Sequence, residues 1–289
     1  MIVTNGSPQT YIGYSDLALN WEDCLDYCIK NETCMVVYNK DDGCQMFEIG
    51  NLQAVKRDPD TRIAFKVVNK NGTCPASDME PAKGYMFGVN ETSERQIYIG
   101  YDINYDPITE SWKLNSTGVN MCISPRTKMF MRDAGPWCIV MVTNSFCSNH
   151  TAMAASCRGL RGQGGELSGF ETPEEFEFMK ERVNISGWLN VTNNRNSALW
   201  MDGVRKPECV GNPSCQGLSA FKLSDPYLSA NPTGFMFNPG QPNGTSEDCL
   251  GFVVNPDKTV GIVSTLCTLT RPGDNSTCYL GYICGMTPS

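Results

Sequence analysis

The chain has 289 residues and a formal net charge of −8, and 40% of its residues are hydrophobic while 19% are charged. This length allows about two domains, and the composition is that of a folded globular chain rather than a disordered one. The acidic balance argues against nucleic acid and acidic membrane surfaces as partners, and no apolar run reaches the roughly 18 residues that a transmembrane helix needs.

Fifteen cysteines and ten Asn-x-Ser/Thr sequences share a chain with one histidine, His150. Cysteine at this density is typical of an oxidising compartment, so we expect an extracellular, secreted protein, and with one histidine we expect no Cys/His zinc site. The opening MIVTNGSPQT contains no apolar signal segment, so we expect the numbering to begin at a trimmed product or the true start to lie upstream. N-glycosylation is expected at Asn5, Asn31, Asn71, Asn90, Asn115, Asn149, Asn184, Asn243 and Asn275.

The first predicted element is a helix capped by Asn20, with Asp23 in its first turn and Cys24 and Cys28 on one face. Strand-like segments follow at residues 35–38, 46–50 and 62–68. Residues 69–121 are rich in turns, contain Cys74 and include strand candidates at 84–89 and 96–101. We interpret this stretch as a linker or β extension.

Two helices are predicted in the second half of the chain. Residues 151–160 form a short helix with Cys157, and residues 171–183 form a second one. The second helix has clear start signals, with Thr172 as the cap, Pro173 at the first position and Glu175 reaching back. Short strands and long loops rich in Gly, Pro, Asn and Ser follow Gly187, and loops of this length are usual where they bind a ligand or are held by disulfides.

The ordered set CISPRTKMFMRDAGPWC, GELSGFETPEEFEF, GWLNV, LWMDG, PGQPNGTSEDC and YLGYICG resembles a C-type lectin-like domain. The N-terminal WEDCLDYCIKNETC, GCQMFEIG and RIAFKV resemble a PAN-like, or CW, domain, and this two-domain order resembles the secreted lectin-like proteins of nematodes. The resemblance implies an α+β fold. A PAN-like domain (1–68), with one helix on a small antiparallel sheet, and the linker or β extension (69–121) precede a lectin-like domain (122–286) with two helices, antiparallel sheets and a long loop region.

The resemblance also implies a disulfide map. It pairs Cys24 with Cys44 and Cys28 with Cys34 in the PAN-like domain, and Cys122 with Cys138, Cys157 with Cys284, Cys209 with Cys215 and Cys249 with Cys267 in the lectin-like domain. Two of the remaining Cys74, Cys147 and Cys278 are expected to pair, with Cys147–Cys278 favoured. Cys74 would then be free or would link two chains as a dimer.

In calcium-dependent members of this family, a loop of the Gln-Pro-Asp or Glu-Pro-Asn type supplies metal ligands that also contact the sugar. The resemblance therefore assigns ligand binding to Gln241, Asn243, Glu247 and Asp248, and calcium coordination to Gln241, Asn243 and Glu247, with the Gln241–Pro242 bond cis. The positions of the family's Asn-Asp pair hold Val263 and Ser264. Because calcium takes six to eight oxygens and gains affinity from carboxylates, we expect a degenerate site.

Two alternatives accompany this loop. Asn243 begins a glycosylation sequence, and its glycan would crowd the site, so the loop would then be a turn kept for folding. The second alternative is that a sugar binds at another site of the protein, without calcium. Among the aromatic residues nearby, Trp188 with Leu189, and Trp200 with the Asp202–Gly203 turn, match core motifs, which also makes Asn190 a poor glycan site. Packing under the long loop is expected for Phe221, Phe235 and Phe237.

No catalytic residue is predicted, since no nucleophile elbow, phosphate loop or metal-spaced histidine cluster is present, and His150 lies among structural cysteines. We expect the protein to require no cofactor, and calcium is the one ion that the resemblance offers as a candidate ligand. The resemblance implies a carbohydrate- or glycoconjugate-recognition protein with a role in innate defence. The alternative is a lectin-like fold that binds a protein, aided by the PAN-like domain.

Overall fold

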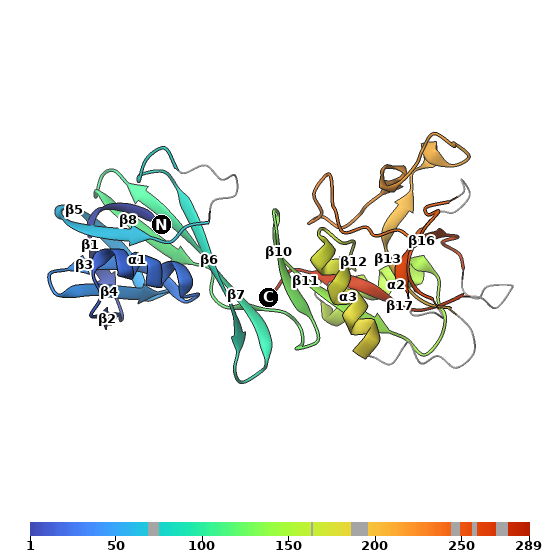
Figure 1. Cartoon of the computed structure of the whole chain (residues 1–289), viewed down its shortest axis with the longest axis horizontal. Coiled ribbons are helices and arrows are strands. Elements are labelled where there is room, and N and C mark those ends of the chain that lie inside the picture. The colour runs from blue at the N-terminus through green and yellow to red at the C-terminus, as the bar shows by residue number, and fades with distance from the viewer. Residues whose placement is uncertain (69–74, 163, 186–195, 244–248, 256–258, 270–276) are drawn as a thin grey trace. The chain divides into compact units, whose positions relative to one another are not determined.

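A computed structural model describes residues 1–68, 75–162, 164–185, 196–243, 249–255, 259–269 and 277–289. The chain divides into two compact units, an N-terminal unit from Met1 to Pro125 that also includes Ser289, and a C-terminal unit from Arg126 to Pro288 (Figure 1). Each has its own sheet and its own buried core. Among the described residues, no helix is long and apolar enough to cross a membrane.

Helix α1 (Trp21–Lys30) is held at its start by the predicted cap. The Asn20 side chain accepts a hydrogen bond from the Asp23 N–H at 3.0 Å, which satisfies one of the helix's unpaired donors. The cysteine face predicted for this helix is buried, since Cys24 and Cys28 are both 0% exposed. Disulfides join Cys24 to Cys44 and Cys28 to Cys34, as the resemblance implied, and fix the helix to the sheet.

The sheet of the N-terminal unit is antiparallel throughout its described pairings, in the order β2-β4-β3-β5-β8-β7-β6, with β1 paired to β5 and β9 to β7. Strand β5 is long enough to pair with β8 through its first half and with β3 through its second half. The strands are β1 (Ile2–Tyr11), β2 (Ser15–Leu17), β3 (Cys34–Lys40), β4 (Gly43–Glu48), β5 (Leu52–Phe65), β6 (Ala82–Asn90), β7 (Arg95–Asp106), β8 (Ser111–Ser116) and β9 (Asn120–Met121).

Of the two interpretations of residues 69–121, linker or β extension, the structure agrees with the β extension, and the strand candidates at 84–89 and 96–101 lie in β6 and β7. Strands β6, β7 and β8 lie in this stretch and continue the same sheet, because β8 pairs with β5 at Val55↔Trp112. Trp112 and Ile103 are buried with Phe65 in one core, so the stretch belongs to the N-terminal unit. Strand β1 and the first half of β5 were not predicted, because Gly6, Pro8 and the charged residues of β5 obscure the alternation.

The C-terminal unit contains helices α2 (His150–Arg158) and α3 (Pro173–Ile185) and short 3₁₀ turns, one of them η3 (Pro207–Cys209). Its sheet has the order β10-β11-β17-β13-β15-β16, with β12 paired to β17 and β14 to β13. The described pairings are antiparallel except that of β13 with β17, which is parallel. The strands are β10 (Lys128–Arg132), β11 (Gly135–Thr143), β12 (Glu166–Leu167), β13 (Asn196–Arg205), β14 (Phe221–Lys222), β15 (Cys249–Val254), β16 (Val260–Thr265) and β17 (Thr277–Met286).

Both helices of this unit begin close to the predicted positions. Helix α2 starts at His150, because Asn149 caps it through a hydrogen bond from the Ala152 N–H at 2.8 Å. Helix α3 starts at Pro173 as predicted. Glu175 does reach back, but one residue further than a capping box requires, since its carboxylate accepts from the Glu171 N–H at 2.7 Å.

Disulfides cross-link this unit at pairs that the resemblance implied and at the Cys147–Cys278 pair that was favoured among the remaining cysteines. Cys157 of α2 is joined to Cys284 of β17, and Cys147 is joined to Cys278. Two further bonds, Cys209–Cys215 and Cys249–Cys267, close the shorter loops. Cys122 and Cys138 are disulfide-bonded as well, and their mutual pairing stays a prediction. Cys74 lies outside the described residues.

Candidate ligand-binding loop

The predicted ligand loop, Gln241–Asn243, lies beside strand β16. The approach to it is fixed by backbone pairing, since the Asn238 N–H donates to the Ile262 carbonyl at 3.0 Å. Gly261 makes this approach possible, because a Cβ there would collide with the Asn238 side chain. The Gln241–Pro242 peptide bond is cis, as the resemblance implied.

The side-chain oxygen of Gln241 is held by the protein itself. Gln241 Oε1 accepts hydrogen bonds from the Ser264 N–H at 3.0 Å and from the Asn243 N–H at 3.2 Å. Ser264 Oγ lies 3.1 Å from the same oxygen and 3.1 Å from the Asn243 carbonyl oxygen, so its single hydrogen serves one of the two. Ser264 is 3% exposed. We call this arrangement of Gln241, Asn243 and Ser264 the loop latch.

The described residues do not fit a calcium ion at this loop. Calcium takes six to eight oxygen ligands and favours carboxylates. Val263 supplies no side-chain oxygen, and Gln241 Oε1 already accepts hydrogen bonds within the loop latch. The described part of the chain contains no group of three or more His, Cys, Asp or Glu that could hold a metal.

The four predicted ligand residues divide into two pairs. Gln241 and Asn243 are brought together with Ser264 by the loop latch, and the Asn243 side chain is exposed and makes no side-chain hydrogen bond to another described residue. Glu247 and Asp248 lie outside the described residues. The exposed amide of Asn243 is therefore the predicted group that the described structure leaves open to a ligand.

A buried aspartate, Asp202, anchors the start of the long loop. Its carboxylate accepts from the Ser224 N–H at 2.8 Å, from Ser224 Oγ at 2.8 Å and from the Asp225 N–H at 2.8 Å. Burial raises the pKa of Asp202 to about 6, and these hydrogen bonds oppose that rise. The sequence identified Asp202 as part of a strand turn, and its anchoring role was missed.

A second anchor, also missed, is the ionic cluster of Arg132, Glu175 and Asp225. Arg132 donates from Nε and Nη2 to Glu175 at 2.8 and 2.7 Å, and from Nη1 to Asp225 at 2.9 Å. The side chains are at most 1% exposed. Burial alone would lower the pKa of Arg132, but the hydrogen bonds to Glu175 and the two negative charges raise it instead. The guanidinium thus stays charged and ties β10 and α3 to the loop.

The aromatic residues that the sequence assigned to the core of this unit are core residues where the structure describes them. Trp200 is 0% exposed, donates from Nε1 to the Ser148 carbonyl at 2.7 Å and stacks on Tyr279. Phe221 is buried, and Phe235 and Phe237 pack against the same core, as expected. Trp188, Leu189 and Asn190 lie outside the described residues.

His150 has a structural environment. It is 8% exposed, its Nε2 lies 3.2 Å from the Met201 carbonyl, and its ring meets Trp200 edge-on. Burial lowers its pKa. The cysteines of this unit whose state is described are disulfide-bonded, so no thiolate for a nucleophile is described beside it.

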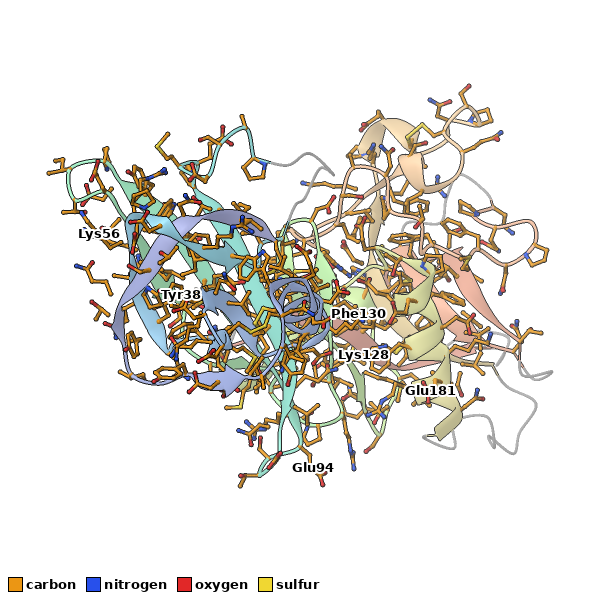
Figure 2. All side chains as sticks on the ribbon, turned by 60° about the vertical axis from the view of Figure 1, so that its left-hand side comes forward. Tyr38, Lys56, Glu94, Lys128, Phe130 and Glu181 are labelled. Carbon is orange, nitrogen blue, oxygen red and sulfur yellow. A yellow bond between two sulfur atoms is a disulfide. The ribbon has the colours of Figure 1, made fainter. Side chains whose placement is uncertain are left out.

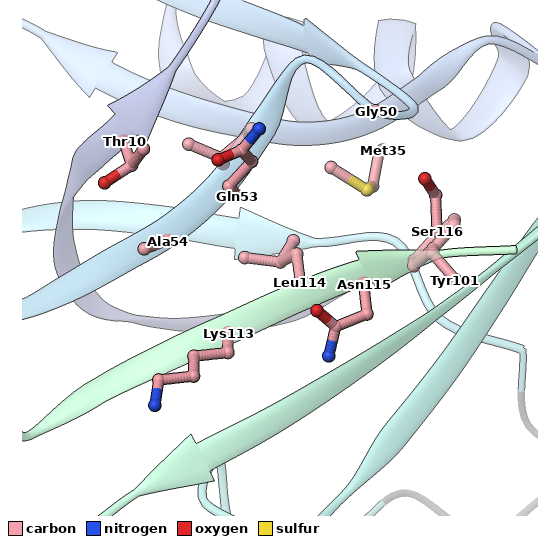
Figure 3. Close-up of a pocket in the computed structure, with 11 residues that line it drawn as sticks. Thr10, Met35, Gly50, Gln53, Ala54, Tyr101, Lys113, Leu114, Asn115 and Ser116 are labelled. Atoms are coloured by element: carbon pink, nitrogen blue, oxygen red, sulfur yellow. The ribbon is translucent and has the colours of Figure 1, made fainter. Parts of the chain in front are cut away.

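The N-terminal unit has a cavity of about 460 Å³ where β5 and β8 diverge (Figure 3). Its floor is apolar, with Met35, Leu52 and Leu114 all buried. Exposed Gln53 and Ser116 stand at its rim and make no side-chain hydrogen bond within the described chain. Such a cavity could accept a small ligand, and its lining includes the charged side chain of Lys113.

Comparison with known families gives two matches. Residues 1–67 match a PAN-like domain, and residues 129–287 match the family described as C-type lectin domain-containing protein 141/158. The second match spans more than half of the 289-residue chain. A comparison with curated proteins gives no match.

Among solved structures, the one titled "Crystal structure of CEL-IV" matches 58% of this chain and 96% of its own. Its sequence is 14% identical over the match, and the TM-score is 0.40.

Proposed function

The chain belongs to the C-type lectin domain-containing protein 141/158 family, and from this premise we propose that it is a secreted, non-catalytic protein that recognises carbohydrate or glycoconjugate without calcium. The recognition surface is the Gln241–Asn243 loop with the adjoining Glu247 and Asp248. The PAN-like unit serves contacts with a protein partner, and innate defence is the role that such recognition would support.

The loop latch is the observation that carries this proposal. A calcium-dependent loop needs its side-chain oxygens turned toward the metal, and without the ion those oxygens would need other partners. Here Ser264 supplies that partner to Gln241 at 3.0 and 3.1 Å. A loop ordered by its own hydrogen bonds needs no metal to hold its shape, so ligand recognition by Asn243 would rely on direct hydrogen bonds.

Secretion is supported by the disulfides. The described bonds lie in both units and close loops as large as the 131-residue separation of Cys147 and Cys278. Bonds of this kind form and persist in oxidising compartments. The absence of catalysis is supported by the burial of His150 and by the absence of a described free thiol beside it.

The test is a glycan array probed with secreted, disulfide-intact protein, once in millimolar calcium and once in excess EDTA. We expect the same glycans to bind under both conditions. Asn243→Ala should weaken binding about tenfold, which corresponds to roughly 1.4 kcal/mol, within the range of one hydrogen bond. Gln216→Ala is the matched control, since Gln216 is exposed in the small Cys209–Cys215 region of the same unit.

Each contrary result has a definite meaning. Binding that disappears in EDTA would refute calcium independence and assign a metal to residues near Glu247. A blank array from folded protein would refute sugar recognition and favour the alternative, a lectin-like fold that binds a protein. Peptide mass mapping of Asn243 accompanies the array, because a glycan attached there would cover the loop.

A further inference from the structure

Three aromatic rings gather on one face of the β6–β7 hairpin in the N-terminal unit. Ring centroids of Tyr85, Phe87 and Tyr98 lie 5.1 to 5.8 Å apart, and the Tyr85 and Tyr98 planes differ by 32°. Figure 2 shows Glu94 at the turn that closes this hairpin. All three rings are half-buried. We call them the ring platform.

Gly100 lets one of these rings lie along the sheet. It stands opposite Tyr85 in the pairing of β6 with β7, and a Cβ at this position would meet Tyr98 Oη at 3.0 Å. The Tyr98 ring therefore covers the glycine. Burial raises the pKa of Tyr98, with Tyr85 and Asp102 adding to the rise, which agrees with this packing.

The same face of the sheet carries the glycosylation sequence at Asn115. Asn115 pairs with Asp102 across β7–β8, and Asp102 lies two and four residues beyond Gly100 and Tyr98. Alternate residues of a strand, and residues directly opposite in neighbouring strands, share a face. Asn115 and the ring platform thus lie on one side of the sheet, and Figure 3 shows Lys113 and Asn115 leaving β8 on the side opposite to Ser116.

This face is open to solvent around Asn115. The side chains of Lys83 and Asp102, which pair across β6–β7 on it, are 79% and 47% exposed. Asn115 is exposed, and within the described chain its amide makes no side-chain hydrogen bond. At Asn5 and Asn31, by contrast, Nδ2 donates to Pro59 O at 2.9 Å and to Tyr27 Oη at 3.4 Å. Nδ2 is the atom to which a glycan is attached, so Asn115 is the better placed acceptor.

We propose that Asn115 carries an N-glycan whose first sugars lie across Gly100 and stack on the ring platform. The C–H bonds on the flat face of a sugar are weakly positive, and an aromatic face is negative, so the two attract and bury apolar surface together. Two or three half-buried rings would hold a free sugar weakly. A sugar tethered to Asn115 has an effective concentration in the millimolar range or above, which is why the chain's own glycan is the favoured occupant.

This inference requires passage through the secretory pathway, but it requires no sugar recognition by the lectin-like unit. Failure of the glycan array therefore leaves it intact. Its role is structural: the glycan would cover the hairpin rings and stabilise the sheet of the N-terminal unit.

The test uses the full chain secreted from a host that attaches N-glycans. Glycopeptide mass spectrometry should find Asn115 occupied. Asn115→Gln, which keeps an amide but removes the acceptor, should lower the melting temperature of the N-terminal unit by a few degrees. The matched control is Asn184→Gln, an exposed acceptor on α3 in the other unit, which should leave that temperature unchanged.

A double-mutant cycle separates stacking from a general effect of glycan bulk. In a Tyr85→Leu/Tyr98→Leu background, Asn115→Gln should no longer lower the melting temperature. An equal loss in both backgrounds would overturn the proposal, as would an unoccupied Asn115. In case the ring variant does not fold, NMR of the unmutated glycoprotein gives an independent answer: ring-current shifts should move protons of the first sugar upfield, and unshifted signals would contradict stacking.

The same platform could instead serve a sugar from another molecule. Titration of the Asn115→Gln protein with free chitobiose distinguishes the two sources. Saturable binding at the ring platform together with an unoccupied Asn115 in the secreted protein would overturn the assignment to the chain's own glycan.

Discussion

At the scale of single residues, Ser264 is the basis of the proposed calcium independence of the loop. The resemblance placed an oxygen-rich pair at residues 263 and 264, and the chain has valine and serine there. A serine hydroxyl is too weak a ligand to replace a carboxylate, but it is the right length to bond Gln241 Oε1 at 3.1 Å. The substitution thus removes a metal ligand and adds an internal hydrogen bond.

The missing ligands can be restored as a test. We expect the unmutated protein to melt at the same temperature in calcium and in EDTA. Val263→Asn/Ser264→Asp adds two side-chain ligands and frees Gln241 Oε1 from the serine hydroxyl, so its melting temperature should rise with calcium concentration as ligand binding stabilises the fold. Differential scanning calorimetry measures both. Ser264→Ala, which removes the hydroxyl without adding a ligand, should cost about 1 kcal/mol and show no calcium response.

Asp202 should make the stability of the C-terminal unit depend on pH. Its folded-state pKa of about 6 lies above the ordinary 3.8, so its contribution is fully present below pH 3.8 and is lost as the pH rises through about 6. The two-unit difference corresponds to roughly 3 kcal/mol. Asp202→Asn should be less stable at neutral pH because its NH₂ faces the Asp225 N–H, but the fall between pH 4 and 7 should flatten. Urea titrations of both proteins across this range provide the comparison, and parallel pH profiles would refute the assignment.

At the scale of elements, the long loop is held by backbone pairing of β14 with β13 and of Phe237 with Ile262, and by side chains from α3, from the residues just before it, from β10 and from β13. Glu171 accepts from Ser229 N–H at 2.7 Å and from Ser229 Oγ at 2.6 Å. Arg132 forms ion pairs with Glu175 and Asp225, which lie 43 and 93 positions away from it in the sequence. Hydrophobic periodicity and capping signals describe neighbours in sequence, so they predicted the start of α3 but could not predict that Glu175, apparently a cap, would be an ion-pair partner.

Breaking the ionic cluster should be costly. Arg132→Leu leaves the buried carboxylates of Glu175 and Asp225 without their cation, and we expect a loss of about 3–5 kcal/mol in the free energy of unfolding. Lys128→Ala on the same strand is the control. Lys128 makes an exposed pair with Glu174 at 3.0 Å and lies over the Phe130 ring (Figure 2), so its loss should cost at most about 1 kcal/mol. Chemical denaturation measures both, and equal losses would contradict the burial argument.

At the scale of the whole molecule, the sequence predicted the two-part layout through patterns that depend on short spacings. The cysteines of α1 and the capping asparagine at position 20 are such patterns, and the described structure contains them. Strands β6 and β7 were predicted at 84–89 and 96–101 within a linker or β extension, but β8 and the pairing that joins all three to the first sheet were not predicted. Turn-rich residues between these strands suggested a linker, while the buried Trp112 that ties β8 to β5 gives a signal that can be interpreted only once its partner strand is known.

The division into two units leads to a prediction about the Cys157–Cys284 bond, which closes a loop of 127 residues within the C-terminal unit. The Cys147–Cys278 bond spans most of this loop and stays closed in the variant, so Cys157→Ser/Cys284→Ser gives the unfolded chain only the freedom of a short loop and should destabilise that unit by roughly 3 kcal/mol. The N-terminal unit has its own core and its own Cys24–Cys44 and Cys28–Cys34 bonds, so its melting should not change. Calorimetry should therefore show one transition moved to lower temperature and one unmoved. If both transitions moved together, the two units would have to unfold as a single cooperative body, and the local action of this disulfide would be refuted.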